Sequence, residues 1–244
     1  MGGMKLSVVL PTYNEAENLA PLLDRLEDLL GGRPGLAFEV IVVDDSSPDG
    51  TGRVAERCAR KYGNIRLLTR PGKAGLSSAV LAGLRMAQGE MIAVMDADLQ
   101  HPPEPLGLGL QTLEQGADLV VMSRYLASSQ IRGRSSLRAW LSRSAILLTR
   151  LLIPAARPLS DPVSGFFLCR SDVIRGMTFR TLGYKILMEV LVGGSYRRLV
   201  ELPYTFHPRA AGSSKLRLDE AFKYPRLLGH LIFRTRRPAE GGAV

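Results

Sequence analysis

Met91-Ile92-Ala93-Val94-Met95-Asp96-Ala97-Asp98 joins an apolar run directly to a pair of aspartates. Five apolar residues in a row are typical of a buried β-strand, and the two aspartates mark the point where that strand ends. Carboxylates two positions apart at a strand end suit Mg²⁺ or Mn²⁺, which prefer a few carboxylates together with substrate phosphates. An Asp-x-Asp pair also occurs in helix caps and solvated loops, so the pair alone leaves both interpretations open.

The same arrangement recurs on either side of this stretch. Apolar runs at 6–10, 38–43 and 119–122 also end in polar residues, and a further strand is predicted at 65–69. Helical periodicity predicts helices between these runs, at 15–30, 51–62, 75–88 and 102–115, with Asn14 as the N-cap of the first. This alternation predicts an α/β fold with a mostly parallel sheet covered by helices on both faces. Ligands bind outside the carboxyl ends of such strands, so the polar strand ends should form one rim.

The second half of the chain is less regular. It is predicted to contain a basic amphipathic helix (135–153), a strand (163–169), a short helix (184–192), a second strand (199–206) and another amphipathic helix (218–233). We predict a main domain over residues 1–215. Residues 216–244 should form a C-terminal amphipathic helix with a basic tail.

Charge is distributed unevenly along the 244 residues, which carry a formal net charge of +9. No acidic residue lies between Asp118 and Asp161, although seven arginines do, and a second basic set runs from Arg209 to Arg237. This pattern predicts anionic partners: a membrane surface, phosphorylated substrates or nucleic acid. No apolar run reaches the ~20 residues of a transmembrane helix, so membrane contact should be peripheral. The two isolated cysteines fit a reduced compartment.

Two function classes find little support. No Gly-x-Gly-x-x-Gly or Walker sequence follows the first strand, which argues against dinucleotide binding and P-loop chemistry. The basic residues accompany apolar helices and match no nucleic-acid-binding motif, so a nucleic-acid-binding protein is only a remote alternative.

Several short motifs together resemble a known family. Pro11-Thr12-Tyr13-Asn14-Glu15, Val43-Asp44-Asp45-Ser46-Ser47-Pro48-Asp49-Gly50-Thr51 and Asp96-Ala97-Asp98-Leu99-Gln100-His101-Pro102-Pro103-Glu104 are similar to signatures of family 2 glycosyltransferases with the GT-A fold. Ser123-Arg124-Tyr125, Asp161-Pro162-Val163-Ser164-Gly165-Phe166-Phe167 and Arg209-x5-Lys215 resemble the dolichol-phosphate mannose synthase type. The resemblance covers roughly residues 5–235 and implies a GT-A glycosyltransferase domain.

The resemblance implies roles for individual residues. The guanosine of a GDP-mannose donor would be contacted by Pro11, Tyr13, Glu15, Val43 and Asp45. The ribose, diphosphate and metal would be met by Asp96, Ala97 and Asp98; the metal ligands would be Asp98 and Gln100, with Asp96 nearby. His101 is expected to cap or pack in the loop rather than to bind the metal.

Three cations are expected to hold phosphates. The resemblance gives this role to Arg124, Arg209 and Lys215, so that the catalytic set is Asp96, Asp98, Arg124 and Lys215. On the predicted helix 135–153, Arg138 and Ser142 are four residues apart and could grip the acceptor phosphate, with Arg134 nearby. The alternative for Arg138 is a side chain that lies along apolar surface with its charged end in water.

The implied reaction is an inverting transfer of mannose from GDP-mannose to dolichyl or polyprenyl monophosphate. The acceptor phosphate is already anionic, so no dedicated general base is needed. We expect the enzyme to work peripherally on the cytoplasmic side of a membrane, directly or through a separate membrane subunit, and not to bind nucleic acid. The nearest alternative is the same chemistry with another donor such as UDP-glucose; an inactive scaffold of the same fold is a third.

Overall fold

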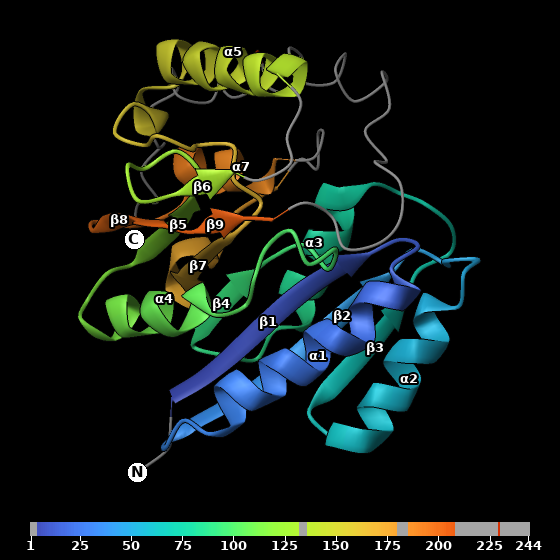
Figure 1. The fold of residues 1–244 in the computed structure, drawn as a ribbon. Helices are drawn as coiled ribbons and strands as arrows, with labels where there is room; N and C mark the ends of the chain where they lie inside the picture. Colours follow the sequence, from blue (N-terminus) through green and yellow to red (C-terminus); the bar gives the residue numbers. More distant parts are fainter. Residues whose placement is uncertain (1–3, 132–135, 180–184, 208–228, 230–244) are drawn as a thin grey trace.

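The structure is a computed structural model, and it describes residues 4–131, 136–179, 185–207 and 229 (Figure 1). Its strands are β1 (Met4–Thr12), β2 (Leu36–Asp44), β3 (Ile65–Thr69), β4 (Met91–Val94), β5 (Leu119–Ser123), β6 (Gln130–Ile131), β7 (Phe167–Arg170), β8 (Leu199–Pro203) and β9 (Thr205–Phe206). Its helices are α1 (Ala16–Gly31), α2 (Thr51–Tyr62), α3 (Leu76–Met86), α4 (Pro105–Glu114), α5 (Ser136–Leu152), α6 (Ser171–Ile174) and α7 (Ile186–Gly193), with a 3₁₀ turn η1 (Pro154–Ala156).

Seven strands form one sheet in the order β3-β2-β1-β4-β7-β5-β8. All neighbouring pairs are parallel except those of β7, which runs antiparallel to both β4 and β5. The predicted mostly parallel α/β sheet is therefore confirmed. Because β1 lies between β2 and β4 and runs parallel to both, the loops that follow these three strands leave the sheet at the same edge.

Helices cover both faces of the sheet, as predicted. In β1, Val8 packs with the apolar sides of α1, α2 and α4, whereas Val9 packs in a second cluster with α3 and α7. The predicted apolar stripe of the first helix is fully buried, and it consists of Leu19, Leu22, Leu23, Leu26 and Leu30. Each buried leucine contributes about 1.5–3 kcal/mol relative to an exposed one, so burial of this stripe fixes α1 on the sheet.

Three local predictions were wrong. Asn14 does not cap α1: it has a positive φ of 56°, and Glu15 takes the N-cap position without a side-chain capping bond. The strand predicted at 163–169 begins only at Phe167, because residues 161–164 form a turn in which the N–H of Ser164 donates to the carbonyl of Asp161. The strand predicted at 199–206 is interrupted at Tyr204, so that β8 joins the main sheet while β9 pairs with β6.

The second half contains the predicted basic helix as α5, whose side chains are described from residue 144 onward. The helix predicted at 218–233, the basic tail and the domain boundary at 215/216 lie outside the described residues and stay predictions. Within the described ranges, no helix combines the length and the apolar character that a membrane crossing requires.

Candidate active site

The loops after β1, β2 and β4 form the rim on which the site residues lie. Each loop contains one non-glycine residue with a positive φ: Asn14 at 56°, Ser46 at 50° and Leu99 at 59°. Such conformations cost of order 1–3 kcal/mol each and persist where the surroundings over-determine them, often at functional sites. The three strained residues thus lie at the edge of the sheet where the sequence predicts ligand binding.

The first two loops are tied together by hydrogen bonds. The backbone N–H of Asn14 donates to Ser47 Oγ (2.9 Å), that of Glu15 to Thr51 Oγ1 (2.9 Å) and that of Ala16 to Asp49 Oδ2 (3.0 Å). The other oxygen of Asp49 accepts from the N–H of Thr51 at 3.0 Å. One carboxylate therefore serves the amino-terminal ends of both α1 and α2 and holds Tyr13 and Glu15 at the rim.

The two aspartates at the end of β2 have different partners. Asp45, 4% exposed, accepts from Arg70 Nε at 2.7 Å and from the N–H of Ala74 at 3.1 Å. These contacts fasten the loop 70–75 to the rim and place Lys73 Nζ 4.5 Å from the centre of the Tyr13 ring. Asp45 and Tyr13, both expected to meet the nucleoside, are therefore brought to the same part of the rim. Val43 and Pro11 lie beside one another in the paired strands β2 and β1.

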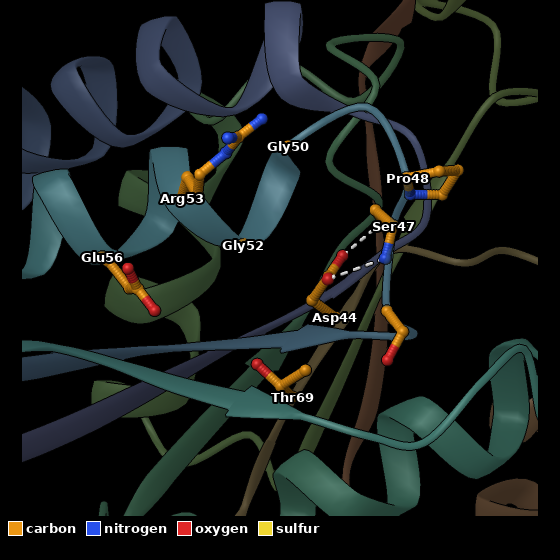
Figure 2. A pocket seen from close by; sticks show the side chains of 9 residues that line it. Asp44, Ser47, Pro48, Gly50, Gly52, Arg53, Glu56 and Thr69 are labelled. Carbon is orange, nitrogen blue, oxygen red and sulfur yellow. Dashed lines mark hydrogen bonds between the residues drawn. The ribbon is translucent and has the colours of Figure 1, made fainter.

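A pocket of about 410 Å³ lies at the end of β2, beside the first turns of α2 (Figure 2). Its Asp44 carboxylate accepts hydrogen bonds from the N–H and the hydroxyl of Ser47. The pocket is lined by Asp44, Ser46, Ser47, Pro48, Gly50, Gly52, Arg53, Glu56 and Thr69.

The acidic motif after β4 is folded tightly. Asp98 is 6% exposed and accepts the N–H of Gln100 at 3.1 Å, while the side chain of Asp96 remains 36% exposed. His101 is 3% exposed, and its Nδ1 accepts the N–H of Asp96 at 3.2 Å. Burial lowers the pKa of His101 to about 4 even though the nearby Asp98 carboxylate opposes that shift. His101 therefore stays neutral and packs in the loop, as predicted.

The residues of this motif fit a divalent cation. They offer the carboxylates of Asp96 and Asp98 and the amide oxygen of Gln100, whose Nε2 donates to the carbonyl of His207 at 3.3 Å. Oxygen donors of this kind suit Mg²⁺ or Mn²⁺. Among the described residues, no group of three or more His, Cys, Asp and Glu side chains is arranged to hold a metal by itself. The motif therefore suits an ion that completes its coordination with substrate phosphate and water.

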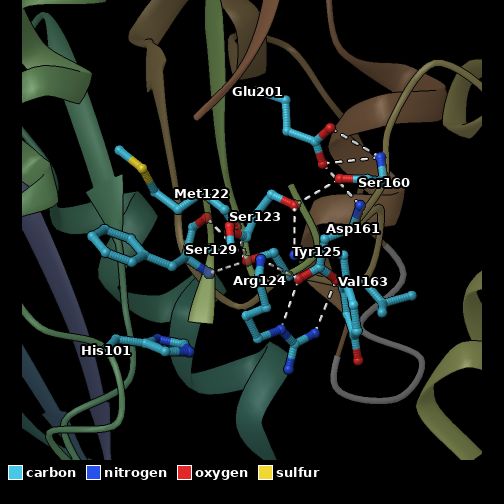
Figure 3. Close-up of polar contacts among 12 residues, drawn as sticks. His101, Met122, Ser123, Arg124, Tyr125, Ser129, Ser160, Asp161, Val163 and Glu201 are labelled. Carbon is cyan, nitrogen blue, oxygen red and sulfur yellow. Dashed lines mark hydrogen bonds and ion pairs between the residues drawn. The ribbon is translucent and has the colours of Figure 1, made fainter. Parts of the chain in front are cut away.

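Arg124 reaches the same region from the end of β5 (Figure 3). Its Nε and Nη2 donate to the two oxygens of Asp161 at 2.7 and 2.9 Å, and its side chain is 10% exposed while that of Asp161 is fully buried. Burial alone lowers the pKa of Arg124, but the charge and hydrogen bonds of Asp161 raise it above its usual value. Arg124 is therefore a permanent cation in a fixed orientation.

The loop that carries Asp161 also lies against the acidic motif. A methyl group placed on Gly165 would come within 3.3 Å of Asp96 Oδ2 and of His101 Cε1. In the same loop the carbonyl of Val163 accepts from Lys185 Nζ at 2.7 Å. This loop thus links Arg124 to Asp96, although the two residues follow different strands.

The structure does not test every predicted residue. Arg134, Arg209 and Lys215 lie outside the described residues, and so do the side chains of Arg138 and Ser142 on α5. Their assignment to phosphate binding stays a prediction. Conversely, the pairing of Asp161 with Arg124 and the hydrogen bonds of Glu201 to the same loop were not predicted, because 37 to 41 residues separate the partners.

Comparison with known proteins decides the family. Residues 7–177 match the family described as Glycosyl transferase family 2, which is more than half of the chain. The chain belongs to glycosyltransferase family 2. This confirms the resemblance deduced from the strand-end motifs.

Relatives of this family 2 glycosyltransferase include three proteins named dolichol-phosphate mannosyltransferase. The one from Pyrococcus furiosus is 42% identical over 229 residues, which are 94% of this chain and 64% of that protein. The one from Mycosarcoma maydis is 35% identical over 92% of this chain and 78% of that protein. The one from Saccharomyces cerevisiae is 34% identical over 93% of this chain and 87% of that protein. The chain thus spans less than two thirds of the Pyrococcus protein.

Solved structures with a similar fold are more distant in sequence. Glucosyl-3-phosphoglycerate synthase from Mycobacterium tuberculosis, crystallised with Mn²⁺, UDP-glucose and phosphoglyceric acid, matches with a TM-score of 0.68 and 22% identity, over 99% of this chain and 83% of that one. Mannosyl-3-phosphoglycerate synthase from Rubrobacter xylanophilus matches with a TM-score of 0.69 and 21% identity, over 96% and 74%. These likenesses support the GT-A fold.

Proposed function

We propose that this glycosyltransferase transfers mannose from GDP-mannose to dolichyl or another polyprenyl monophosphate, with inversion at the sugar carbon. The observation that carries the proposal is the meeting of two groups of opposite charge at one rim. The acidic motif of Asp96 and Asp98 faces the loop that fixes the cationic Arg124. Relatives at 34–42% identity bear the name of this activity.

The chemistry follows from the charges of the two substrates. A phosphate oxygen of the acceptor forms a bond to the sugar carbon, and the bond from that carbon to the GDP oxygen breaks. The acceptor oxygen is already anionic, so the site need not remove a proton from it. Its task is to bring two anions together and to stabilise the diphosphate as it leaves. Arg124, preorganised on Asp161, suits the second task.

A divalent cation, Mg²⁺ or Mn²⁺, would be held by Asp98 and Gln100 with Asp96 beside them. When bound, it supplies positive charge that offsets the charge of the departing diphosphate. Arg209 and Lys215 are proposed as further cations that bind the donor and acceptor phosphates. The acceptor phosphate is also proposed to contact Arg134, Arg138 and the neutral hydroxyl of Ser142.

The acceptor is a lipid, and α5 offers a surface for it. Leu147 and Leu151 are 70% and 69% exposed, on a helix that also carries Arg150. Exposed leucines beside basic residues are typical of helices that lie in the interface of an anionic bilayer. We propose peripheral contact with the cytoplasmic face of a membrane, made by this helix directly or with a membrane subunit.

The experiment is a product assay. Purified protein is incubated with GDP-mannose or UDP-glucose, with Mg²⁺ or Mn²⁺, and with a polyprenyl phosphate, and the glycolipid is identified by its mass. We expect polyprenyl-phosphate mannose from GDP-mannose, and only in the presence of a divalent ion. Glucose transfer from UDP-glucose as the main product would contradict the donor assignment while leaving the reaction type intact.

Nucleotide affinity provides an independent check on the donor. A ligand that binds only the folded state raises the unfolding temperature with its concentration, so GDP should give a larger shift than UDP when Mn²⁺ is present. A larger shift with UDP would favour the UDP-glucose alternative.

A further inference from the structure

The ion pair between Arg124 and Asp161 depends on a second carboxylate. Asp161 lies on a loop, and its own backbone N–H donates to Glu201 Oε1 at 2.8 Å. The N–H of the preceding residue, Ser160, donates to both oxygens of Glu201 at 3.0 and 2.9 Å. Two consecutive N–H groups thus converge on one carboxylate directly behind the residue that orients the arginine (Figure 3).

Glu201 is itself placed by the sheet. It lies in the middle of β8 and is paired in register with Val121 of β5, the strand that leads to Arg124. A further hydrogen bond of 2.7 Å joins the hydroxyls of Ser123 and Ser160. The contacts therefore form a closed ring that runs from β5 through Arg124, Asp161 and Glu201 back to β5. In such a ring, the position of the guanidinium is set by the sheet rather than by the loop alone.

We propose that Glu201 is a positioning residue of the transfer reaction, which holds the Ser160–Asp161 backbone so that Asp161 fixes Arg124 toward the acidic motif. This inference rests on the proposed function, in which Arg124 binds a phosphate. Electrostatic stabilisation by a preorganised cation requires that the cation is already in place when charge develops. A misplacement of about 1 Å can lower a rate by about 100-fold, so the support beneath the arginine matters as much as the arginine.

A merely structural role for Glu201 is the competing explanation, and the chain offers a matched control for it. Glu39 is also a strand carboxylate that accepts a backbone N–H, that of Gln88, at 2.8 Å. It binds Ser7 and Arg66 as well, near the amino ends of the strands and thus at the edge of the sheet opposite to the rim. Glu39→Gln should disturb the fold at least as much as Glu201→Gln but leave Arg124 untouched.

The test compares wild type, Glu201→Gln, Glu201→Asp and Glu39→Gln. Transfer kinetics are measured for all four, together with the unfolding temperature and the nitrogen-15 spectrum of the arginine Nε–H groups. The Arg124 Nε–H is hydrogen-bonded at 2.7 Å and should give a resonance that is protected from exchange with water. This resonance is identified by its absence from the spectrum of Arg124→Lys.

We expect Glu201→Gln to lower kcat by about 10- to 100-fold and to expose the Arg124 Nε–H to exchange. Glu201→Asp should lower kcat and expose the Arg124 Nε–H to a smaller extent. Glu39→Gln should lower the unfolding temperature but change neither kcat nor the exchange of the Arg124 Nε–H. Wild-type kcat and an unchanged Arg124 resonance in Glu201→Gln would overturn the proposal. If the wild type transfers no sugar, the proposed function fails, whereas the Arg124 resonance still decides whether Glu201 positions it.

Discussion

Replacement of Asp161 by asparagine removes a negative charge from a fully buried position. Arg124, whose side chain is only 10% exposed, then loses the partner that it reaches through hydrogen bonds of 2.7, 2.9 and 3.3 Å. Removal of one member of a buried ion pair typically costs about 3–5 kcal/mol, because the other charge is left without compensation. Asparagine keeps one acceptor oxygen, so we expect a loss near the lower end, about 3 kcal/mol of unfolding free energy.

The assay is equilibrium unfolding in urea near neutral pH, applied to Asp161→Asn, Arg124→Met and the double variant. Each single change leaves one buried charge alone, whereas the double change removes both. The loss in the double variant should therefore be smaller than the sum of the two single losses by about 2 kcal/mol, within the range seen for residues in direct contact. A typical domain is stable by about 5–15 kcal/mol, so all three variants should stay folded.

Two results would contradict a buried, coupled ion pair. One is a loss below about 1 kcal/mol in Asp161→Asn, the magnitude of an exposed ion pair. The other is strict additivity of the two single changes, which would mean that the side chains do not interact across the distances found here.

Four further predictions follow from single residues. Tyr204 is 4% exposed, and its hydroxyl has no hydrogen-bond partner among the described residues, so Tyr204→Phe should leave the unfolding temperature unchanged or raise it. The control is Tyr196→Phe, which removes a 2.9 Å hydrogen bond to the carbonyl of Leu191 and should lower the unfolding temperature. Burial lowers the pKa of His101 to about 4 in the folded protein, so as the pH falls below 6.5 the unfolded chain binds a proton at this residue before the folded chain does. Lowering the pH from 6.5 to 5 should therefore reduce the free energy of unfolding by about 2 kcal/mol. Urea unfolding in metal-free buffer measures this loss, which His101→Gln should lack. Asp98→Ala should abolish transfer at saturating Mn²⁺ while the circular dichroism spectrum stays that of the wild type; near-normal activity would contradict the metal assignment. Gly165→Ala should crowd Asp96 and His101, because the new methyl group would approach both to 3.3 Å. It should lower kcat/KM clearly while changing the unfolding temperature little.

Much of the first half of the fold follows from local sequence alone. The helix 51–62 and the strand 65–69 were predicted with their observed bounds, because their patterns are bounded by glycines or by a change of periodicity. The arrangement of the acidic motif on the rim also follows, since parallel strands end at one edge. The bounds of these elements and the place of the acidic motif are predictable because the local sequence pattern agrees with the tertiary packing.

The errors lie where tertiary contacts override local preference. Asn14 was expected to cap α1, but Ser47 and Asp49 of the neighbouring loop satisfy the backbone there, which frees residue 14 to adopt a positive φ. The support of Arg124 by Asp161 and Glu201 was not predicted either, because a carboxylate gives no sign in the sequence of which distant N–H groups it will accept. Such partners become visible only when β7 and β8 are placed on either side of β5.

A crystal structure with GDP and Mn²⁺ would show whether the loops after β1, β2 and β4 and the arginine after β5 surround one nucleotide diphosphate. We expect Mn²⁺ bound to Asp98, with the diphosphate between that ion and Arg124 and the base near Tyr13. A nucleotide bound away from this rim, or bound there with the cation remote from Asp98, would contradict this arrangement.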